Sequence, residues 1–262
     1  MEVNNQNPFI AGNWKMFKTI PEAVELVKAL KEKSPEFSDA ELVVIPPFTA
    51  LSEVKKVIEG STIKLGAQNL FWEEQGAFTG EVSAPMLKDA GCQYVTIGHS
   101  ERRQYFGETD KTVNKKIRAA LAYELYPIMC LGESLEEREK GKTIDKVESQ
   151  INSGLEGLGS EEISKIIIAY EPLWAIGTGL TATPAQAEEV HSFIREKLVE
   201  KYGKKTASCA IILYGGSVKP DNAYSLLKEN NINGALVGGA ALKADSFAQI
   251  AKEAIKAYKE KK

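Results

Sequence analysis

Four polar residues that could carry out acid–base chemistry stand at or just after the ends of short apolar runs in this 262-residue chain: Asn13, Lys15, His99 and Glu171. Glu171 follows the run "IIIAY", so its carboxylate emerges from an apolar segment. Partial burial there can raise the proton affinity of a carboxylate into the range that suits a general base. Asn13 and Lys15 are two residues apart, and a continuing extended backbone would point both side chains the same way.

Each of these assignments has a structural alternative. Lys15 alone would be most simply a solvated surface lysine, and Glu171 could be a surface or ion-paired carboxylate. His99 ends the run "YVTIGH" before a polar turn, a position that suits a catalytic and a structural histidine equally. His191 lies inside a helical pattern and is interpreted as structural. The proline and glycines of "EPLWAIGTG" favour a functional Glu171, because a structural carboxylate needs no mobile neighbour.

Glycines close two later apolar runs, in "YGGSVKP" and "LVGGA". Glycine lets backbone N–H groups approach an anion closely, and the alternative is a pair of tight turns. The residues concerned are Ser217, Gly238 and Gly239. Together the two segments predict an anion-binding site, such as one for phosphate.

The elements that would hold these residues are eight short runs rich in β-branched residues. Runs such as "LVVIP" are nearly continuous in apolar character, which is typical of parallel strands covered on both faces. The predicted strands are Pro8–Asn13, Glu41–Pro46, Ile63–Gln68, Tyr94–His99, Tyr126–Leu131, Lys165–Glu171, Ala210–Gly215 and Gly234–Gly238.

Helical patterns lie between the strands. Val24, Val27 and Leu30 recur at three-residue steps, and a later segment begins with Thr183 as a cap and stops at Gly203. Eight alternating units without a Gly-, Ser- or Pro-rich linker favour a single α/β domain over residues 1–262, a closed (β/α)8 barrel. In such a barrel the active site lies at the C-terminal ends of the strands, where the polar residues stand.

Composition excludes several classes of function. Hydrophobic content of 43% and charged content of 26% are those of an ordinary globular domain. The net charge of −3 argues against nucleic-acid binding. The sequence has no run of eighteen apolar residues that would predict a membrane span, and it has no signal-like start that would predict secretion. The three cysteines lack metal-site or redox spacing and suggest a reducing, cytoplasmic location: Cys92, Cys130 and Cys209.

The motifs together resemble triosephosphate isomerases over almost the whole chain. "AGNWKM", "GAQN", "GAFTGEVS", "IGHSERR", "CLGE", "AYEPLWAIGTG", "YGGSVKP" and "ALVGG" occur in the order typical of that family. The resemblance implies interconversion of dihydroxyacetone phosphate and glyceraldehyde 3-phosphate through an enediolate, in glycolysis and gluconeogenesis. It implies no metal and no organic cofactor.

The resemblance also implies residue roles. Glu171 would remove a proton beside the carbonyl, and His99, as neutral imidazole, would polarise the carbonyl and move a proton between the oxygens. Lys15 would supply positive charge near oxyanion and phosphate, and Asn13 would donate a hydrogen bond. The implied supporting residues are Glu101 and Cys130. The phosphate would bind largely to backbone N–H groups of Gly177, Ser217, Gly238 and Gly239.

The same resemblance implies functions for two loops. A lid over the phosphate would consist of Pro172, Leu173, Trp174, Ala175, Ile176, Gly177, Thr178, Gly179, Leu180, Thr181 and Ala182. The loop "QNLFWEEQGAFTGEVS", with Thr79 at its tip, would insert into a second copy of the chain and form a homodimer. Two departures from the family pattern are Leu180, where a basic residue is frequent, and Ala241, where serine is frequent.

Two other functions compete with this interpretation. Another phosphate-binding barrel, such as an aldolase, would share the glycine loops, but a Schiff-base aldolase needs a lysine on a central strand and Lys15 follows the first. A barrel that only binds or scaffolds is the non-enzyme alternative, since a fold alone does not specify a function.

Overall fold

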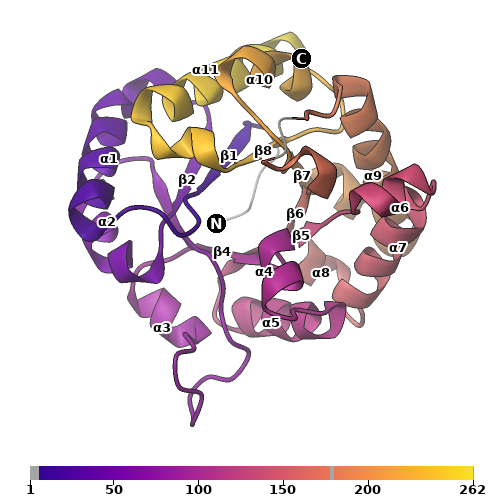
Figure 1. Cartoon of the computed structure of the whole chain (residues 1–262), viewed down its shortest axis with the longest axis horizontal. Helices are drawn as coiled ribbons and strands as arrows, with labels where there is room; N and C mark the ends of the chain where they lie inside the picture. Colours follow the sequence, from indigo (N-terminus) through magenta and orange to yellow (C-terminus); the bar gives the residue numbers. More distant parts are fainter. Residues whose placement is uncertain (1–5, 178–179, 262) are drawn as a thin grey trace.

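Eight parallel strands close into a barrel in the computed structural model, which describes residues 6–177 and 180–261. The strands follow one another around the barrel in sequence order, and β8 pairs with β1 (Figure 1). They are β1 Phe9–Asn13, β2 Glu41–Ile45, β3 Lys64–Ala67, β4 Tyr94–Ile97, β5 Tyr126–Leu131, β6 Ile167–Tyr170, β7 Ile211–Tyr214 and β8 Gly234–Val237. The predicted barrel is confirmed, and most strands are one or two residues shorter at an end than the apolar runs.

Helices form a ring around the strands, as Figure 1 shows. The α-helices are α1 Ile20–Lys33, α2 Leu51–Ile58, α3 Ala84–Asp89, α4 Ser100–Tyr105, α5 Asp110–Ala122, α6 Leu135–Glu139, α7 Thr143–Gly154, α8 Ser160–Ile163, α9 Pro184–Cys209, α10 Pro220–Leu227 and α11 Ala244–Lys261. Short 3-10 helices are η1 Ser34–Phe37, η2 Phe48–Ala50, η3 Leu173–Ala175 and η4 Gly239–Leu242. Within the described ranges, no helix is long and apolar enough to cross a membrane.

Both faces of each strand are buried, which explains the continuous apolar runs. In β1, Phe9 and Ala11 belong to the cluster that fills the barrel, whereas Ile10 belongs to the cluster between strands and helices. The same alternation occurs in β6, with Ala169 inside and Tyr170 outside. Side chains therefore fill the barrel, and the polar chemistry is confined to its ends.

Helix α9 begins and is interrupted where the sequence predicted. The Thr183 hydroxyl accepts a hydrogen bond from the Gln186 backbone N–H at 3.2 Å, and the Gln186 side chain accepts one from the Thr183 N–H at 3.0 Å. This reciprocal pairing satisfies N–H groups that have no partner inside the helix. Gly203 has a φ of 82° and breaks the helical geometry, after which a further helical turn leads to β7.

Candidate active site

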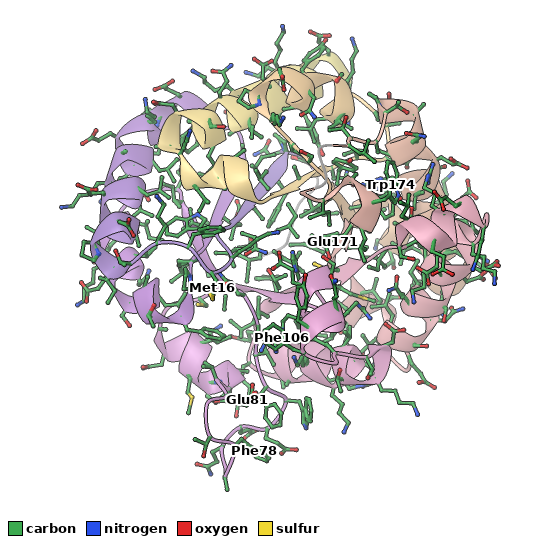
Figure 2. All side chains as sticks on the ribbon, in the orientation of Figure 1. Met16, Phe78, Glu81, Phe106, Glu171 and Trp174 are labelled. Atoms are coloured by element: carbon green, nitrogen blue, oxygen red, sulfur yellow. The ribbon has the colours of Figure 1, made fainter. Side chains whose placement is uncertain are left out.

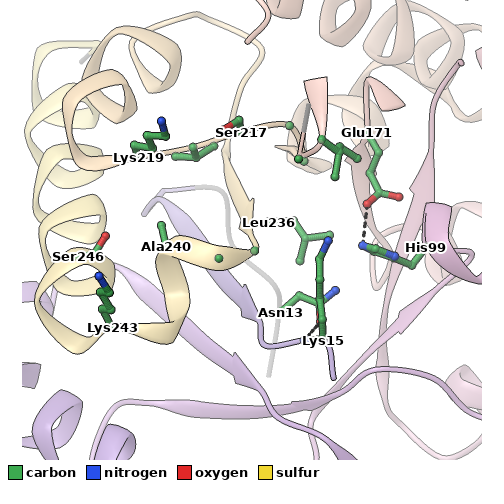
Figure 3. A pocket seen from close by; sticks show the side chains of 17 residues that line it. Asn13, Lys15, His99, Glu171, Ser217, Lys219, Leu236, Ala240, Lys243 and Ser246 are labelled. Atoms are coloured by element: carbon green, nitrogen blue, oxygen red, sulfur yellow. Dashed lines mark hydrogen bonds and ion pairs between the residues drawn. The ribbon is translucent and has the colours of Figure 1, made fainter. Parts of the chain in front are cut away.

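One cavity of about 460 Å³ lies at the C-terminal ends of the strands (Figure 3). It is lined by all four side chains for which chemistry was predicted and by the four residues expected to contact phosphate. These are Asn13, Lys15, His99, Glu171, Gly177, Ser217, Gly238 and Gly239. The cavity thus brings together residues from the ends of five strands. The first and last of these residues are more than 220 positions apart in the chain.

Glu171 is the buried carboxylate of this cavity, with 2% of its side chain exposed. Its Oε1 lies 3.0 Å from His99 Nε2, and its Oε2 accepts a hydrogen bond from the Ser100 backbone N–H at 2.9 Å. Burial alone would raise the pKa of Glu171, but His99 and Ser100 outweigh it and hold the pKa below its usual value. The expectation of a raised proton affinity therefore does not describe this arrangement.

The tautomer of His99 follows from its neighbours. Nδ1 accepts a hydrogen bond from the Glu101 backbone N–H at 3.3 Å, so the proton of the neutral ring belongs on Nε2, facing Glu171. Burial is the largest single effect and lowers the pKa of His99, but the charge and hydrogen bond of Glu171 together with the charge of Glu101 outweigh it and raise the pKa above its usual value. Nε2 is therefore the atom that donates a hydrogen bond into the cavity.

Lys15 reaches the cavity by a different backbone path from the one expected. Its φ of 53° is left-handed, so the strand periodicity does not continue past Asn13. The Asn13 carboxamide oxygen accepts the Lys15 backbone N–H at 2.9 Å, and Gln68 Nε2 donates to the Lys15 carbonyl at 2.8 Å. Lys15 Nζ pairs with Glu101 Oε1 at 2.6 Å. Asn13 and Lys15 still line the same cavity, but Asn13 belongs to the end of β1 and turn geometry places Lys15 there.

The strand ends beside Glu171 approach one another very closely. The Glu171 N–H donates to the Leu131 carbonyl at 2.7 Å, and a Cβ atom at Gly132 would lie 1.8 Å from the Glu171 carbonyl oxygen. Only glycine fits there. Cys130, two residues earlier, is fully buried, and burial together with the Glu171 charge raises the pKa of its thiol well above the usual value. Cys130 is thus a neutral thiol close to the carboxylate.

The first half of the expected lid is anchored to Glu133, a residue for which sequence reasoning predicted no role. Its Oε1 accepts hydrogen bonds from Trp174 Nε1 at 2.9 Å and Tyr170 Oη at 3.1 Å. Its carbonyl accepts the Leu173 N–H at 3.0 Å, and Arg138 stacks over the Trp174 ring at 4.9 Å. The signal for Glu133 was its place in "CLGE", just after β5.

The rest of the lid divides between two cavities. Ile176 and Gly177 line the cavity at the strand ends, and the Ser217 N–H, expected to contact phosphate, donates to the carbonyl of Ala175 at 3.1 Å. Leu180 lines a neighbouring cavity of about 820 Å³ that also touches Trp174. The predicted lid residues Thr178 and Gly179 lie outside the described residues.

His191 does not line the cavity at the strand ends, as its structural interpretation predicts. Its Nδ1 is 2.7 Å from the Ala187 carbonyl, and its ring packs edge-on against Tyr170. Burial lowers the pKa of His191 to about 4, so the ring is neutral near pH 7. No group of three or more His, Cys, Asp or Glu side chains that could hold a metal ion occurs in the part of the chain that the structure describes.

Comparisons with known proteins agree with this geometry. Residues 8–254 match the model of the family described as triosephosphate isomerase. The chain is 57% identical over 245 residues to the triosephosphate isomerase of Caldanaerobacter subterraneus subsp. tengcongensis, covering 94% of this chain and 98% of that one. For the enzyme of Endomicrobium trichonymphae the identity is 56% over 247 residues, with the same coverage. A crystal structure of triosephosphate isomerase from Bartonella henselae superposes with a TM-score of 0.85 at 42% identity, covering 94% of this chain and 98% of that one. The chain therefore belongs to the triosephosphate isomerase family.

Proposed function

We propose that the cavity at the strand ends is where this enzyme interconverts dihydroxyacetone phosphate and glyceraldehyde 3-phosphate in glycolysis, and in gluconeogenesis by the reverse reaction. The observation that carries this assignment is the 3.0 Å contact between His99 Nε2 and Glu171 Oε1 inside a cavity that also holds Lys15 and the glycine loops. A base and a neutral proton donor thus meet beside an anion-binding surface.

Glu171 acts as the base. Its present hydrogen bonds to Ser100 and His99 lower its pKa and keep it ionised. When substrate fills the cavity, the carboxylate exchanges these donors for the carbon-bound proton beside the carbonyl, in a site from which water is displaced. Loss of the donors in a buried position raises the proton affinity of Glu171, which makes the transfer from carbon favourable.

His99 moves protons between the two oxygens. The Glu101 N–H on Nδ1 holds the ring in the Nε2–H tautomer, so Nε2 donates to the carbonyl oxygen as the enediolate forms. The proton of the neighbouring hydroxyl returns to Nε2, and Glu171 delivers its proton to the former carbonyl carbon. Lys15, positioned by its ion pair with Glu101, and Asn13 stabilise the negative charge on oxygen.

The phosphate is held at the glycine loops under the lid. Gly177, Gly238 and Gly239 line the cavity, and backbone N–H groups there suit an anion without a metal ion. The Ser217 N–H becomes available when Ala175 moves away from it. Lid closure and phosphate binding are therefore coupled through a shared hydrogen-bond donor.

Hydrogen exchange with solvent tests the mechanism. Isomerisation of glyceraldehyde 3-phosphate in ²H₂O should place deuterium on a carbon of dihydroxyacetone phosphate, because the proton on Glu171 exchanges with solvent. Glu171→Gln should abolish isomerisation and deuterium incorporation while circular dichroism stays unchanged. A Glu171→Gln variant with parental turnover would disprove the assignment. Schiff-base trapping by borohydride at Lys15 would favour the aldolase alternative.

The working form is a homodimer located in the cytoplasm. The loop over residues 69–83 extends away from the barrel (Figure 1), and Phe78 near its tip is 43% exposed (Figure 2). Met16, which directly follows Lys15, is 94% exposed. Apolar side chains this accessible favour burial against a second copy of the chain. The base of the loop is held firmly, because Lys116 Nζ donates to Asn69 Oδ1 at 2.7 Å.

A further inference from the structure

The catalytic cavity extends beyond the residues that a triose phosphate would occupy. Figure 3 shows Lys219, Lys243 and Ser246 at the end of the cavity opposite to His99 and Glu171. Ser217 and Ala240, which adjoin the glycines expected to hold the phosphate, lie between the two ends (Figure 3). A three-carbon monophosphate with its reacting carbons at Glu171 therefore leaves this outer end of the cavity unfilled.

The outer end is positively charged. Glu171 is the sole carboxylate among the described residues that line the cavity, and it belongs to the inner end. Lys15 is paired with Glu101, but within the described ranges neither Lys219 nor Lys243 has a carboxylate oxygen within 4 Å. Two cations without a paired carboxylate face the same space.

Hydrogen bonds hold the backbone around both lysines in place. Asn222 bridges the loop before α10, because its side chain accepts the Lys219 N–H at 2.8 Å and donates to the Ser217 carbonyl at 3.0 Å. Lys243 directly precedes α11, and its carbonyl accepts the Phe247 N–H at 3.0 Å. Ser246 lies in the first turn of that 18-residue helix, where the helix dipole also favours negative charge.

We propose that Lys219, Lys243 and Ser246 form an outer anion subsite that accepts the second phosphoryl group of short-chain bisphosphates. This proposal rests on the proposed function, because the first phosphoryl group must sit at Gly238 and Gly239. A bisphosphate would then bridge the glycine loops and the outer end of the cavity, and it would compete with triose phosphate without being isomerised. Open-chain sugar bisphosphates have the chemistry that this arrangement recognises.

Both lysine side chains are exposed, so the expected gain in affinity is moderate. An exposed charge pair contributes up to about fivefold in affinity, and two contributions of about threefold each multiply to about tenfold. The subsite therefore makes the protein bind bisphosphates more tightly than the related monophosphates, and it adds to the binding of the first phosphoryl group.

Competitive inhibition tests the subsite directly. Linear alkanediol bisphosphates with two to six carbons are compared with the hydroxyalkyl monophosphates of equal length, as inhibitors of glyceraldehyde 3-phosphate isomerisation at 0.15 M ionic strength, roughly the physiological value. At the best length, the bisphosphate should bind about tenfold more tightly than its monophosphate. Lys219→Met with Lys243→Met should reduce this ratio to about twofold or less, and Lys219→Arg with Lys243→Arg should retain it.

Lys204→Met with Lys205→Met is the matched control, because it removes the same charge from exposed positions of α9. It should leave the ratio unchanged. Equal affinity of the parent for both ligands at every length, or the same loss of preference in the control variant, would overturn the subsite. A parent protein without isomerase activity would count against the proposed function instead, and direct calorimetric titration with the bisphosphate would still decide the subsite.

Discussion

Replacement of Gly132 by alanine should displace Glu171, the proposed base, and lower kcat/KM far more than its effect on the stability of the barrel would explain. A Cβ atom at this position would lie 1.8 Å from the Glu171 carbonyl oxygen, and real Cβ contacts are essentially never shorter than 3.0 Å. The two strand ends must therefore separate by about 1.2 Å at the residue that carries the base. A misplacement of about 1 Å can reduce the rate of an enzyme about a hundredfold.

The matched control is Gly60→Ala. Gly132 has a φ of 158° and Gly60 a φ of 75°, both of which L side chains rarely adopt. A Cβ atom added at Gly60, however, would meet no atom within 4 Å, and Gly60 does not line the cavity. Its replacement should cost roughly 1–2 kcal/mol of stability through backbone strain alone. Gly132→Ala should cost a comparable or larger amount, about 1–3 kcal/mol, through overpacking. Stability alone therefore does not distinguish the two variants strongly.

Activity distinguishes them. In a coupled assay with glyceraldehyde 3-phosphate at 25 °C, we expect Gly132→Ala to lower kcat/KM by about a hundredfold or more, and Gly60→Ala to leave it within about twofold. Urea unfolding of both variants shows whether each is folded under the assay conditions. If folded Gly132→Ala kept kcat/KM within about threefold of the parent, the close strand contact would not position Glu171, and the reasoning would be wrong.

Four further outcomes are expected. Lys15→Met should lose roughly 3 kcal/mol of transition-state stabilisation, measured from kcat/KM. Leu180→Lys should change kcat/KM by less than about tenfold, and an effect as large as that of Lys15→Met would refute the assignment of the substrate-stabilising charge to Lys15. Glu108 is buried, and its Oε2 lies 2.9 Å from Arg102 Nε and 3.0 Å from Lys116 Nζ. These two cations outweigh burial and lower the pKa of Glu108. The stability that this carboxylate contributes is therefore present above its unfolded pKa near 4.5 and is lost as the pH falls through the lower folded value. The unfolding free energy of the parent should therefore fall more steeply below pH 4.5 than that of Glu108→Gln, as chemical denaturation at stepped pH will show. Thr79→Asp should shift sedimentation toward monomers and reduce activity, and an unaltered dimer would remove this loop from the interface. Amide exchange of residues 172–177 should slow when a phosphorylated enediolate analogue binds, and equal protection with and without the analogue would argue against a lid.

The strands and the polar side chains that line the cavity were predictable because their signals are local. An apolar run followed by a polar residue marks the end of a buried strand, and the eight runs define the barrel together with its functional end. The cap at Thr183 and the break at Gly203 are local in the same way.

The supporting contacts were not predictable, because they join distant segments. Glu133 holds Trp174 across 41 positions, and Gln68 holds the Lys15 carbonyl across 53. Sequence periodicity carries no information on such pairs. The left-handed turn at Lys15 was missed for a related reason, since Asn13 and Gln68 stabilise a conformation that lysine itself disfavours.

The anchoring of the lid by Glu133 has a consequence for the choice of substrate. Movement of Trp174 toward the cavity breaks its hydrogen bond to a carboxylate that has none of its side chain exposed to water. Movement of Ala175 likewise breaks its bond to the Ser217 N–H. A phosphoryl group would compensate by accepting the released Ser217 N–H, whereas unphosphorylated glyceraldehyde has no anionic group to place there. Under the proposed function, we therefore expect these resting contacts to disfavour closure over unphosphorylated trioses before any proton is transferred.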